Sequence, residues 1–281
     1  MPLQHILGLD HVVVTVRDLD AAADAWRRLG FTVSPRGTHS AHLGSANYTI
    51  MFGEDYVELL GVLTPTDHLQ PTIAFLKRRE GIERAAFTTD DAAAGAAELR
   101  ARGIDAIGPV HFGRPVELPG GGAGEARFNV FRWPVGEAPG GLRVFACQHL
   151  TRETVWIPEL MRHANGADRL IRVEVLAADP AAAAGHLSRL IDEPVVAGPD
   201  GHLVHSGGRR ADFLFLDETR FAARYPAAAR VGAAAEGAAA LVVGTADPAG
   251  AARIPGALPD GAGGVLVPAA AATGVLLHFR A

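Results

Sequence analysis

Cysteine is almost absent from this chain of 281 residues, since Cys147 is the only one. A single thiol excludes an intrachain disulfide. Chains without disulfides are typical of reducing compartments, so we expect a cytoplasmic location. Cys147 lies in an apolar segment, VFACQHL, where a cysteine usually serves as a small core residue rather than as a nucleophile.

Long apolar runs and strongly basic runs are absent as well. No apolar stretch approaches the roughly 18 to 20 residues needed to cross a bilayer, and the N-terminal MPLQHILGLDH lacks the features of a signal peptide. We therefore expect a soluble protein without a membrane partner. The longest cluster of cations is LKRRE at 76–80 and the net charge is −5, which gives no electrostatic support for nucleic-acid binding.

A β-α-β-β-β pattern covers residues 8–62. Its first segment, LDHVVVTV at 9–16, is a β-branched run that predicts a strand. Either Asp18 or Asp20 can cap the following helix, AAADAWRRLG, and Gly30 suits its end. The segments FTVSPRG, HLGSANYTIMFG and DYVELLGV then predict three further strands.

The same order recurs along the chain. A second copy begins with the strand and helix of 81–110 and continues through RFNVFRWP and LRVFACQHL. A third copy starts at 169–191, and a weaker fourth starts at 239–254. The period is irregular, roughly 65 to 85 residues, which indicates duplication of one supersecondary unit rather than a solenoid.

These repeats predict an α+β fold of βαβββ units. The small sheet of one unit cannot bury its own face, so we expect the units to pair side by side into curved, half-open barrels. The predicted organisation is an N-terminal domain at 1–150, with units 8–62 and 81–150, a linker at 151–168, and a degenerate C-terminal domain of two units at 169–281. Residues 217–237 are a further linker candidate.

His11 on the first strand, the helix DLDAAADAWRRLGF and the strand VELLG together resemble the vicinal oxygen chelate superfamily, and more narrowly its glyoxalase-like members. The resemblance implies the glyoxalase/bleomycin-resistance/dioxygenase-like fold. The superfamily includes isomerases, lyases, epimerases, ring-cleaving dioxygenases and metal-free drug-binding proteins. In its metal-dependent members, the first and last strands of two paired units supply ligands to a divalent ion that chelates two neighbouring substrate oxygens.

His11 and Glu58 occupy the ligand positions of the first unit. His11 could instead be a strand histidine that bonds the backbone. Glu58 could instead point to solvent, although alternation places it on one face with Tyr56 and Leu60, and the aromatic neighbour favours the inner face. A carboxylate buried there without a partner would cost several kcal/mol.

The second unit departs from the family pattern. Its first strand offers only Arg84 or Ala86 where a ligand would lie. Its last strand offers Gln148, which aligns with Glu58, and His149, which is the better ligand chemically. We favour His149 as the third ligand, with Gln148 contacting the substrate. Two histidines and one glutamate resemble a facial triad that suits Fe(II), Mn(II), Zn(II) or Ni(II).

Four further residues are weighed for substrate binding. His163 could close over the site, although the Asn-Gly turn that follows it has a structural explanation. Trp156 is expected to pack in the core or between the halves, with substrate stacking as the alternative. Arg127 and Arg132 lie on opposite faces of one strand, so one of them could contact an anionic substrate.

Three functions follow from these features. The first is a metal-dependent lyase or isomerase in which His11, Glu58 and His149 hold the ion and Glu58 also moves a proton. The second is Fe(II)-dependent, extradiol-type cleavage of a catechol. The third is a metal-free protein that sequesters a small apolar molecule in a cup lined by Phe128, Phe131, Trp133 and Phe145. The sequence leaves a homodimer open, although four units could form two cups within one chain.

Overall fold

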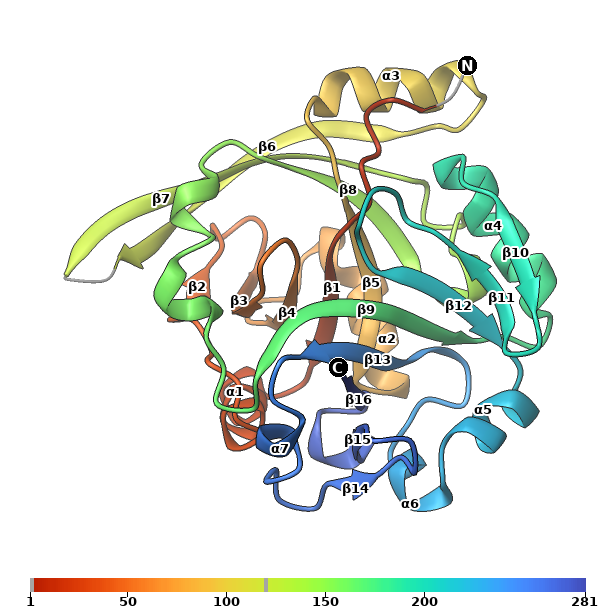
Figure 1. Cartoon of the computed structure of the whole chain (residues 1–281). Coiled ribbons are helices and arrows are strands. Elements are labelled where there is room, and N and C mark those ends of the chain that lie inside the picture. Colours follow the sequence, from red (N-terminus) through yellow and green to blue (C-terminus); the bar gives the residue numbers. More distant parts are fainter. Residues whose placement is uncertain (1–2, 119–120) are drawn as a thin grey trace.

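Two curved eight-stranded sheets form the framework of the computed structural model, which describes residues 3–118 and 121–281 (Figure 1). The strand orders are β2-β3-β4-β1-β5-β8-β7-β6 and β10-β11-β12-β9-β13-β16-β15-β14. The strands of the first sheet are β1 (Leu9–Val16), β2 (Gly37–Thr38), β3 (Ser45–Met51), β4 (Tyr56–Val62), β5 (Gly81–Thr88), β6 (Ile107–Leu118), β7 (Gly122–Arg132) and β8 (Arg143–His149). Those of the second are β9 (Ala167–Leu176), β10 (Val195–Gly198), β11 (Gly201–Val204), β12 (Asp212–Leu216), β13 (Gly237–Thr245), β14 (Leu258–Pro259), β15 (Val265–Val267) and β16 (Leu276–Arg280).

Each sheet joins two βαβββ units through their first strands. In the first sheet β1 pairs antiparallel with β5, while β1 and β5 each pair in parallel with the last strand of their own unit, β4 and β8. The second sheet repeats this arrangement around β9 and β13. The predicted α+β fold of repeated βαβββ units is therefore confirmed.

The helix that follows the first strand begins at an aspartate in all four units. Asp18, Asp91, Asp179 and Asp247 each accept a hydrogen bond from a backbone N–H of the first turn, so Asp18 rather than Asp20 is the first cap. These helices are α1 (Leu19–Arg28), α3 (Ala92–Ala101), α4 (Pro180–Ile191) and α7 (Pro248–Ala251). The remaining helices are α2 (Gln70–Arg78), α5 (Glu218–Arg224) and α6 (Ala227–Arg230). None of the helices within the described ranges is both long and apolar enough to cross a membrane.

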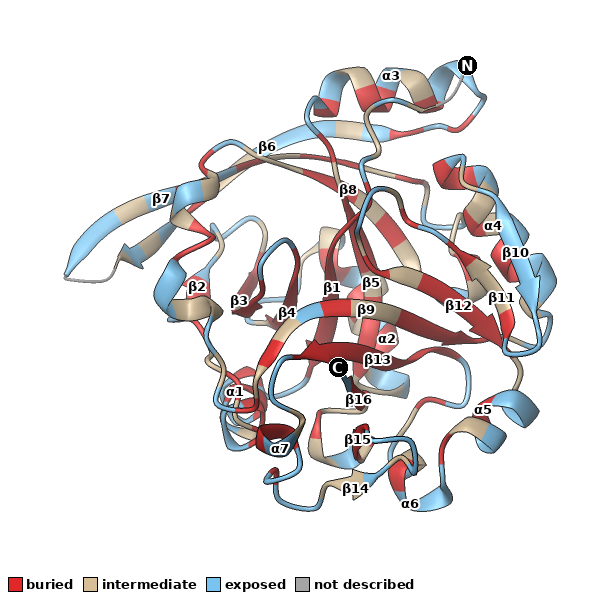
Figure 2. Ribbon diagram, in the orientation of Figure 1, coloured by how far each residue is buried: buried red, intermediate tan, exposed pale blue. Residues whose placement is uncertain are grey.

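The helix-bearing faces of the two sheets share one continuous core. Val12 and Val14 of β1 belong to the same cluster as Val173 of β9 and Leu241 of β13. The rings of Phe87 and Phe213, one from each sheet, have centroids 5.8 Å apart. Both β1 and β13 are buried along their whole length (Figure 2). The opposite face of each sheet is its concave face, and the two concave faces differ.

The concave face of the second sheet is filled by its own chain. Phe221 of α5, Tyr225 directly after it and Ala229 of α6 pack in one cluster with three leucines of the strands, Leu176, Leu214 and Leu276. Residues 217–237, a linker candidate in the sequence, thus provide the packing of this cup. The first sheet instead encloses a cavity of about 280 Å³ on its concave face.

Asp55 connects the two halves and is buried there. Its carboxylate accepts hydrogen bonds from the backbone N–H of Leu170 at the start of β9, at 3.1 and 3.3 Å. Burial raises the pKa of Asp55 from 3.8 to about 7, although the bond from Leu170 opposes the shift. The folded state therefore holds a proton at Asp55 that the unfolded chain releases at lower pH.

We predict that Asp55→Asn removes a pH dependence of stability. Between about pH 4 and 7 the folded wild type binds more protons than the unfolded chain, so its free energy of unfolding falls as the pH rises through this window. The variant should lack this loss and be more stable than the wild type at pH 8 by a few kcal/mol, since one pKa unit corresponds to about 1.4 kcal/mol. Urea unfolding at several pH values measures the difference, with the exposed Asp105→Asn as the control. Parallel curves for Asp55→Asn and the wild type would contradict the assignment.

Candidate active site

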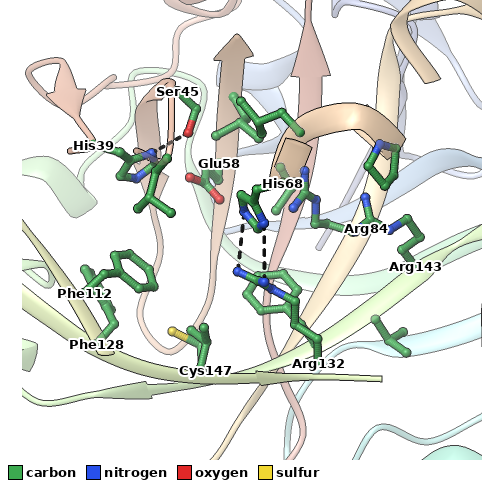
Figure 3. A pocket seen from close by; sticks show the side chains of 18 of the residues that line it. His39, Ser45, Glu58, His68, Arg84, Phe112, Phe128, Arg132, Arg143 and Cys147 are labelled. Atoms are coloured by element: carbon green, nitrogen blue, oxygen red, sulfur yellow. Dashed lines mark hydrogen bonds between the residues drawn. The ribbon is translucent and has the colours of Figure 1, made fainter. Parts of the chain in front are cut away.

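The cavity lies between the two units of the first sheet, with walls from β1, β3, β4, β6, β7 and β8 and from the segment that begins α2 (Figure 3). Aromatic and aliphatic side chains form much of the lining, and Phe112 stacks on Phe128 with ring centroids 5.2 Å apart. Polar and charged groups point into it from both units. A mostly apolar cavity with a few converging polar groups is the usual form of a small-molecule site.

His11 and Glu58 meet at the wall of this cavity. His11 Nε2 lies 3.6 Å from Glu58 Oε2, and the other Glu58 oxygen accepts a hydrogen bond of 2.7 Å from the Asn47 amide. The His11 ring stacks on Tyr56 at a centroid distance of 4.2 Å. The imidazole is almost fully buried, whereas Glu58 retains some exposure toward the cavity. The structure thus brings together the two ligand candidates of the first unit.

A bulge in β1 fixes the orientation of His11. The pairing with β5 passes from Leu9 opposite Phe87 directly to His11 opposite Ala86, so Asp10 has no partner residue. Its carboxylate turns toward the neighbouring imidazole, and His11 Nδ1 lies 2.6 Å from Asp10 Oδ1. When Nδ1 donates its proton to Asp10, the neutral ring presents the lone pair of Nε2 to the Glu58 carboxylate. Two acceptors that face each other need a proton or a cation between them.

Asp10 also binds His149. His149 Nε2 lies 3.0 Å from the same oxygen, Asp10 Oδ1, and the Thr88 hydroxyl donates to the other oxygen at 3.0 Å. Burial alone would raise the pKa of Asp10, but the adjacent His149 and His11 hold it well below its usual range. The carboxylate is therefore ionised and ties the first strand of unit one to the last strand of unit two.

The predicted ligand set of His11, Glu58 and His149 is only partly assembled. His149 shares the concave face of β8 with Cys147, but it reaches His11 only through Asp10 and is not among the residues that line the cavity. Its ring packs edge-on against Trp156 and Phe128, with centroids 4.8 and 5.2 Å away. His149 Nδ1 is buried without a hydrogen-bond partner among the described residues.

A second group could hold a divalent metal. Ligand atoms of Asp10, Cys147 and His149 lie within 4.8 Å of one another. Burial, and then the charges of Asp10 and Glu58, raise the pKa of the Cys147 thiol well above its usual value, so the thiolate would form only with the charge of a bound cation. Asp10 is already engaged by three side chains. The pair of His11 and Glu58, which faces the cavity, fits a metal ion better.

The second unit contributes no ligand at the equivalent positions. In the first unit, His11 of β1 lies opposite Tyr56 of β4, two residues before Glu58. In the second unit, Arg84 of β5 lies opposite Arg143 of β8, two residues before Phe145. Arg84 and Phe145 therefore occupy the positions of His11 and Glu58. The alignment that placed Gln148 opposite Glu58 is therefore wrong, because the register places Phe145 there. Phe145 also packs edge-on against His11 at 5.4 Å.

Gln148 lies on the face of β8 away from the cavity. Its carbonyl oxygen accepts from the Ala92 N–H and the Asn129 amide, and its amide donates to the Asp90 carbonyl, so it supports the start of α3. Since successive side chains alternate between faces, His149 turns inward and Gln148 outward.

The other substrate-binding candidates also lie outside the cavity lining. Trp156 packs on His149 and Tyr56. His163 uses both ring nitrogens structurally, accepting from the Thr32 N–H and donating to the Met51 carbonyl, each at 2.9 Å. Arg127 is exposed, and the cavity-facing arginine of β7 is Arg132.

A buried ion-pair cluster was not anticipated from the sequence. Glu83 occupies a bulge in β5, between Arg84 opposite Val13 and Ile82 opposite Val14. It binds Arg84 and Arg143, each at 2.6 Å, and accepts from Thr15 at 3.0 Å. Burial opposes ionisation, but these two arginines lower the pKa of Glu83. The sequence signal for such a buried acid is a dipeptide in which an acidic residue directly precedes a cavity-facing residue. Asp10–His11 and Glu83–Arg84 both have this form.

His39, in the loop that follows β2, also lines the cavity. Its Nδ1 lies 2.8 Å from the Ser45 hydroxyl, and burial lowers its pKa (Figure 3).

We predict that Asp10→Ala destabilises the protein more than Asp10→Asn. The alanine variant leaves two buried imidazoles without their acceptor, and each unsatisfied group costs about 1 to 3 kcal/mol. The asparagine variant keeps the oxygen that accepts from both imidazoles, loses the charge, and replaces the oxygen that accepts from Thr88 by an amide donor. Urea unfolding provides the measurement, with the exposed Asp24→Asn as the control. Equal stability of Asp10→Ala and the wild type would show that the shared carboxylate is unimportant.

Several solved structures are similar to this chain. Among solved structures, a hypothetical protein from Staphylococcus aureus is 12% identical over 97% of this chain and 98% of its own, with a TM-score of 0.67. The methylmalonyl-CoA epimerase of Mycobacterium tuberculosis matches 53% of this chain and 92% of its own at 20% identity and a TM-score of 0.39. That of Streptomyces coelicolor matches 52% and 96% at 20% identity and a TM-score of 0.39.

A search of curated proteins finds no match. The family model described as "Glyoxalase-like domain" matches residues 9–191, which cover the whole first sheet and the start of the second. The chain therefore belongs to the glyoxalase-like domain family of the vicinal oxygen chelate superfamily.

Proposed function

We propose that the protein is a metal-dependent enzyme of the vicinal oxygen chelate type, a lyase or isomerase that acts on a small substrate with neighbouring oxygens. The observation that carries the proposal is the approach of His11 Nε2 to Glu58 Oε2, at 3.6 Å, beside the cavity. Two ligand atoms at about 2.0 to 2.2 Å from one ion lie roughly 3 to 3.6 Å apart, depending on the bond angle, so the pair fits a shared divalent cation.

The surroundings of the pair support this reading. Asp10 fixes the tautomer and direction of His11, and Asn47 fixes Glu58. Carboxylate and amide groups behind metal ligands commonly have this role. The set of one imidazole and one carboxylate is suited to Fe, Mn, Zn or Ni, and it leaves positions for substrate oxygens.

A bound metal ion would supply Lewis acidity toward a substrate carbonyl or enol. The protein's own part is to position the substrate, exclude water and move a proton. Phe112, Phe128 and Phe145 provide apolar walls around the reacting end of the cavity. Of the carboxylates beside His11 in the described part of the chain, Asp10 is fully buried and Glu58 retains exposure to the cavity, so Glu58 is the group that takes and returns the substrate proton.

Two other functions, a ring-cleaving dioxygenase and a metal-free binding protein, fit the site to different degrees. The dioxygenase alternative requires two histidines and one glutamate around one ion, but His149 contacts Asp10 instead of facing Glu58. A metal-free binding protein is the second candidate. Arg84 and Phe145 at the second unit's ligand positions favour it, as do the aromatic walls of the cavity.

We predict that His11→Ala and Glu58→Gln each abolish stoichiometric metal binding. The wild type, purified without chelator, should contain about one divalent ion per chain by elemental analysis. Titration calorimetry with Zn(II), Mn(II), Ni(II) and anaerobic Fe(II) should show a loss of affinity of well over about tenfold in each variant, since loss of an outer-shell partner of a ligand already costs about 10- to 100-fold. His42→Ala, an exposed histidine of the neighbouring loop, is the matched control.

The metal-free alternative predicts a different outcome. If the wild type carries no ion and binds none of the four metals, or if His42→Ala loses metal as His11→Ala does, the metal-dependent proposal fails.

A further inference from the structure

We propose that the cavity selects a small organic anion and that Arg132 and Arg114 hold its charged group. This names the substrate class of the same cavity and therefore rests on the proposed function. Both arginines come from the β6–β7 hairpin of the second unit, which carries Arg84 and Phe145 at the positions equivalent to His11 and Glu58. The first unit would then hold the reacting oxygens, and the second unit would hold the negative charge.

Arg132 lies in the cavity without an acidic partner among the described residues. Its guanidinium lies along the ring of His68, with nitrogen–nitrogen separations of 3.4 Å (Figure 3). Burial, and then the charge of Arg132, lower the pKa of His68 to about 4, so this imidazole is neutral at physiological pH. The guanidinium thus has a flat neutral neighbour and retains donors for a ligand.

Arg114 is buried and also lacks a partner. Within the described ranges its guanidinium forms no hydrogen bond or ion pair, although it lines the cavity within reach of the charge of Glu58. Gly37 permits its close approach, because a Cβ at that position would lie 2.6 Å from Arg114 Nη1. Burying a guanidinium without a counterion costs free energy that a bound anion would recover.

The neighbouring arginines show what a satisfied pair looks like in this cavity. Arg84 and Arg143 also line it, and both are bound by Glu83. The lining contains four arginines but only two carboxylates, Glu58 and Asp67. Glu83 adds a third carboxylate behind the lining and engages two of the arginines, so Arg132 and Arg114 are the cations that remain available to a bound anion.

The walls limit the rest of the ligand. Phe112 and Phe128 stack beside Ile107 and Leu43, so an apolar substituent fits next to the charged group. A volume of about 280 Å³ is at the lower end of small-molecule sites. The ligand class is thus a small carboxylic acid or other organic anion with an apolar part.

The test compares matched probes on the full-length protein in EDTA, so that no metal contributes. Phenylacetate and its neutral amide, phenylacetamide, differ only in charge, and inorganic phosphate tests for an anion site without an organic requirement. We expect phenylacetate to bind in titration calorimetry and phenylacetamide to bind at least about tenfold more weakly, as for a lost charged hydrogen bond. Arg132→Gln and Arg114→Gln should each weaken phenylacetate binding by a similar factor.

Arg127→Gln is the matched control, because this exposed arginine lies on the other face of β7. Thermal unfolding separates a binding role from a structural one. Since Arg132 and Arg114 lack acidic partners, their variants should keep or raise the melting temperature.

Equal binding of the acid and its amide, equal effects of Arg127→Gln and Arg132→Gln, or binding of phosphate alone would overturn the inference. Metal titration of the same preparations, after the EDTA has been removed by dialysis, separates the two proposals. Metal binding without anion binding rejects only this inference, and anion binding without metal binding rejects only the proposed function.

Discussion

A single buried carboxylate determines the geometry of the site. Asp10 accepts from His11 and His149 through one oxygen and from Thr88 through the other. It can do so only because the bulge in β1 turns it toward the side of its neighbour. The position of His11 against Glu58, the packing of Trp156 over His149 and the joint between the two units all depend on this group. The charge is tolerated inside the protein because both carboxylate oxygens accept hydrogen bonds, and two of the donors are imidazoles.

The two units divide the work of the cavity. The first supplies an imidazole and a carboxylate that face each other, and the second supplies cations and aromatic rings. Equivalent positions carry opposite chemistry, since Arg84 replaces a histidine and Phe145 replaces a glutamate. A duplicated unit gives two copies of every position, so one copy can keep a ligand while the other changes to contact a different part of the same molecule.

Much of the fold was predictable because its signals are local. The acid before each helix and the β-branched strands repeat four times, and the structure confirms Asp18 and its counterparts as caps. The approach of His11 to Glu58 also follows from alternation within two strands. The bulges at Asp10 and Glu83 were not predictable, because they appear only in the pairing between strands. For the same reason, the choice between Gln148 and His149 required the register of β8, and the cavity-facing Arg132 could not be separated from Arg127.

The two concave faces place different demands on later mutations. Where α5 and α6 fill the second cup, a substitution has only to preserve volume and apolar character, and many combinations of side chains satisfy that. The first cup keeps an open cavity with uncompensated arginines, so its side chains cannot be exchanged on packing grounds alone. The filled cup of the second sheet should therefore tolerate more substitutions than the open cup of the first sheet.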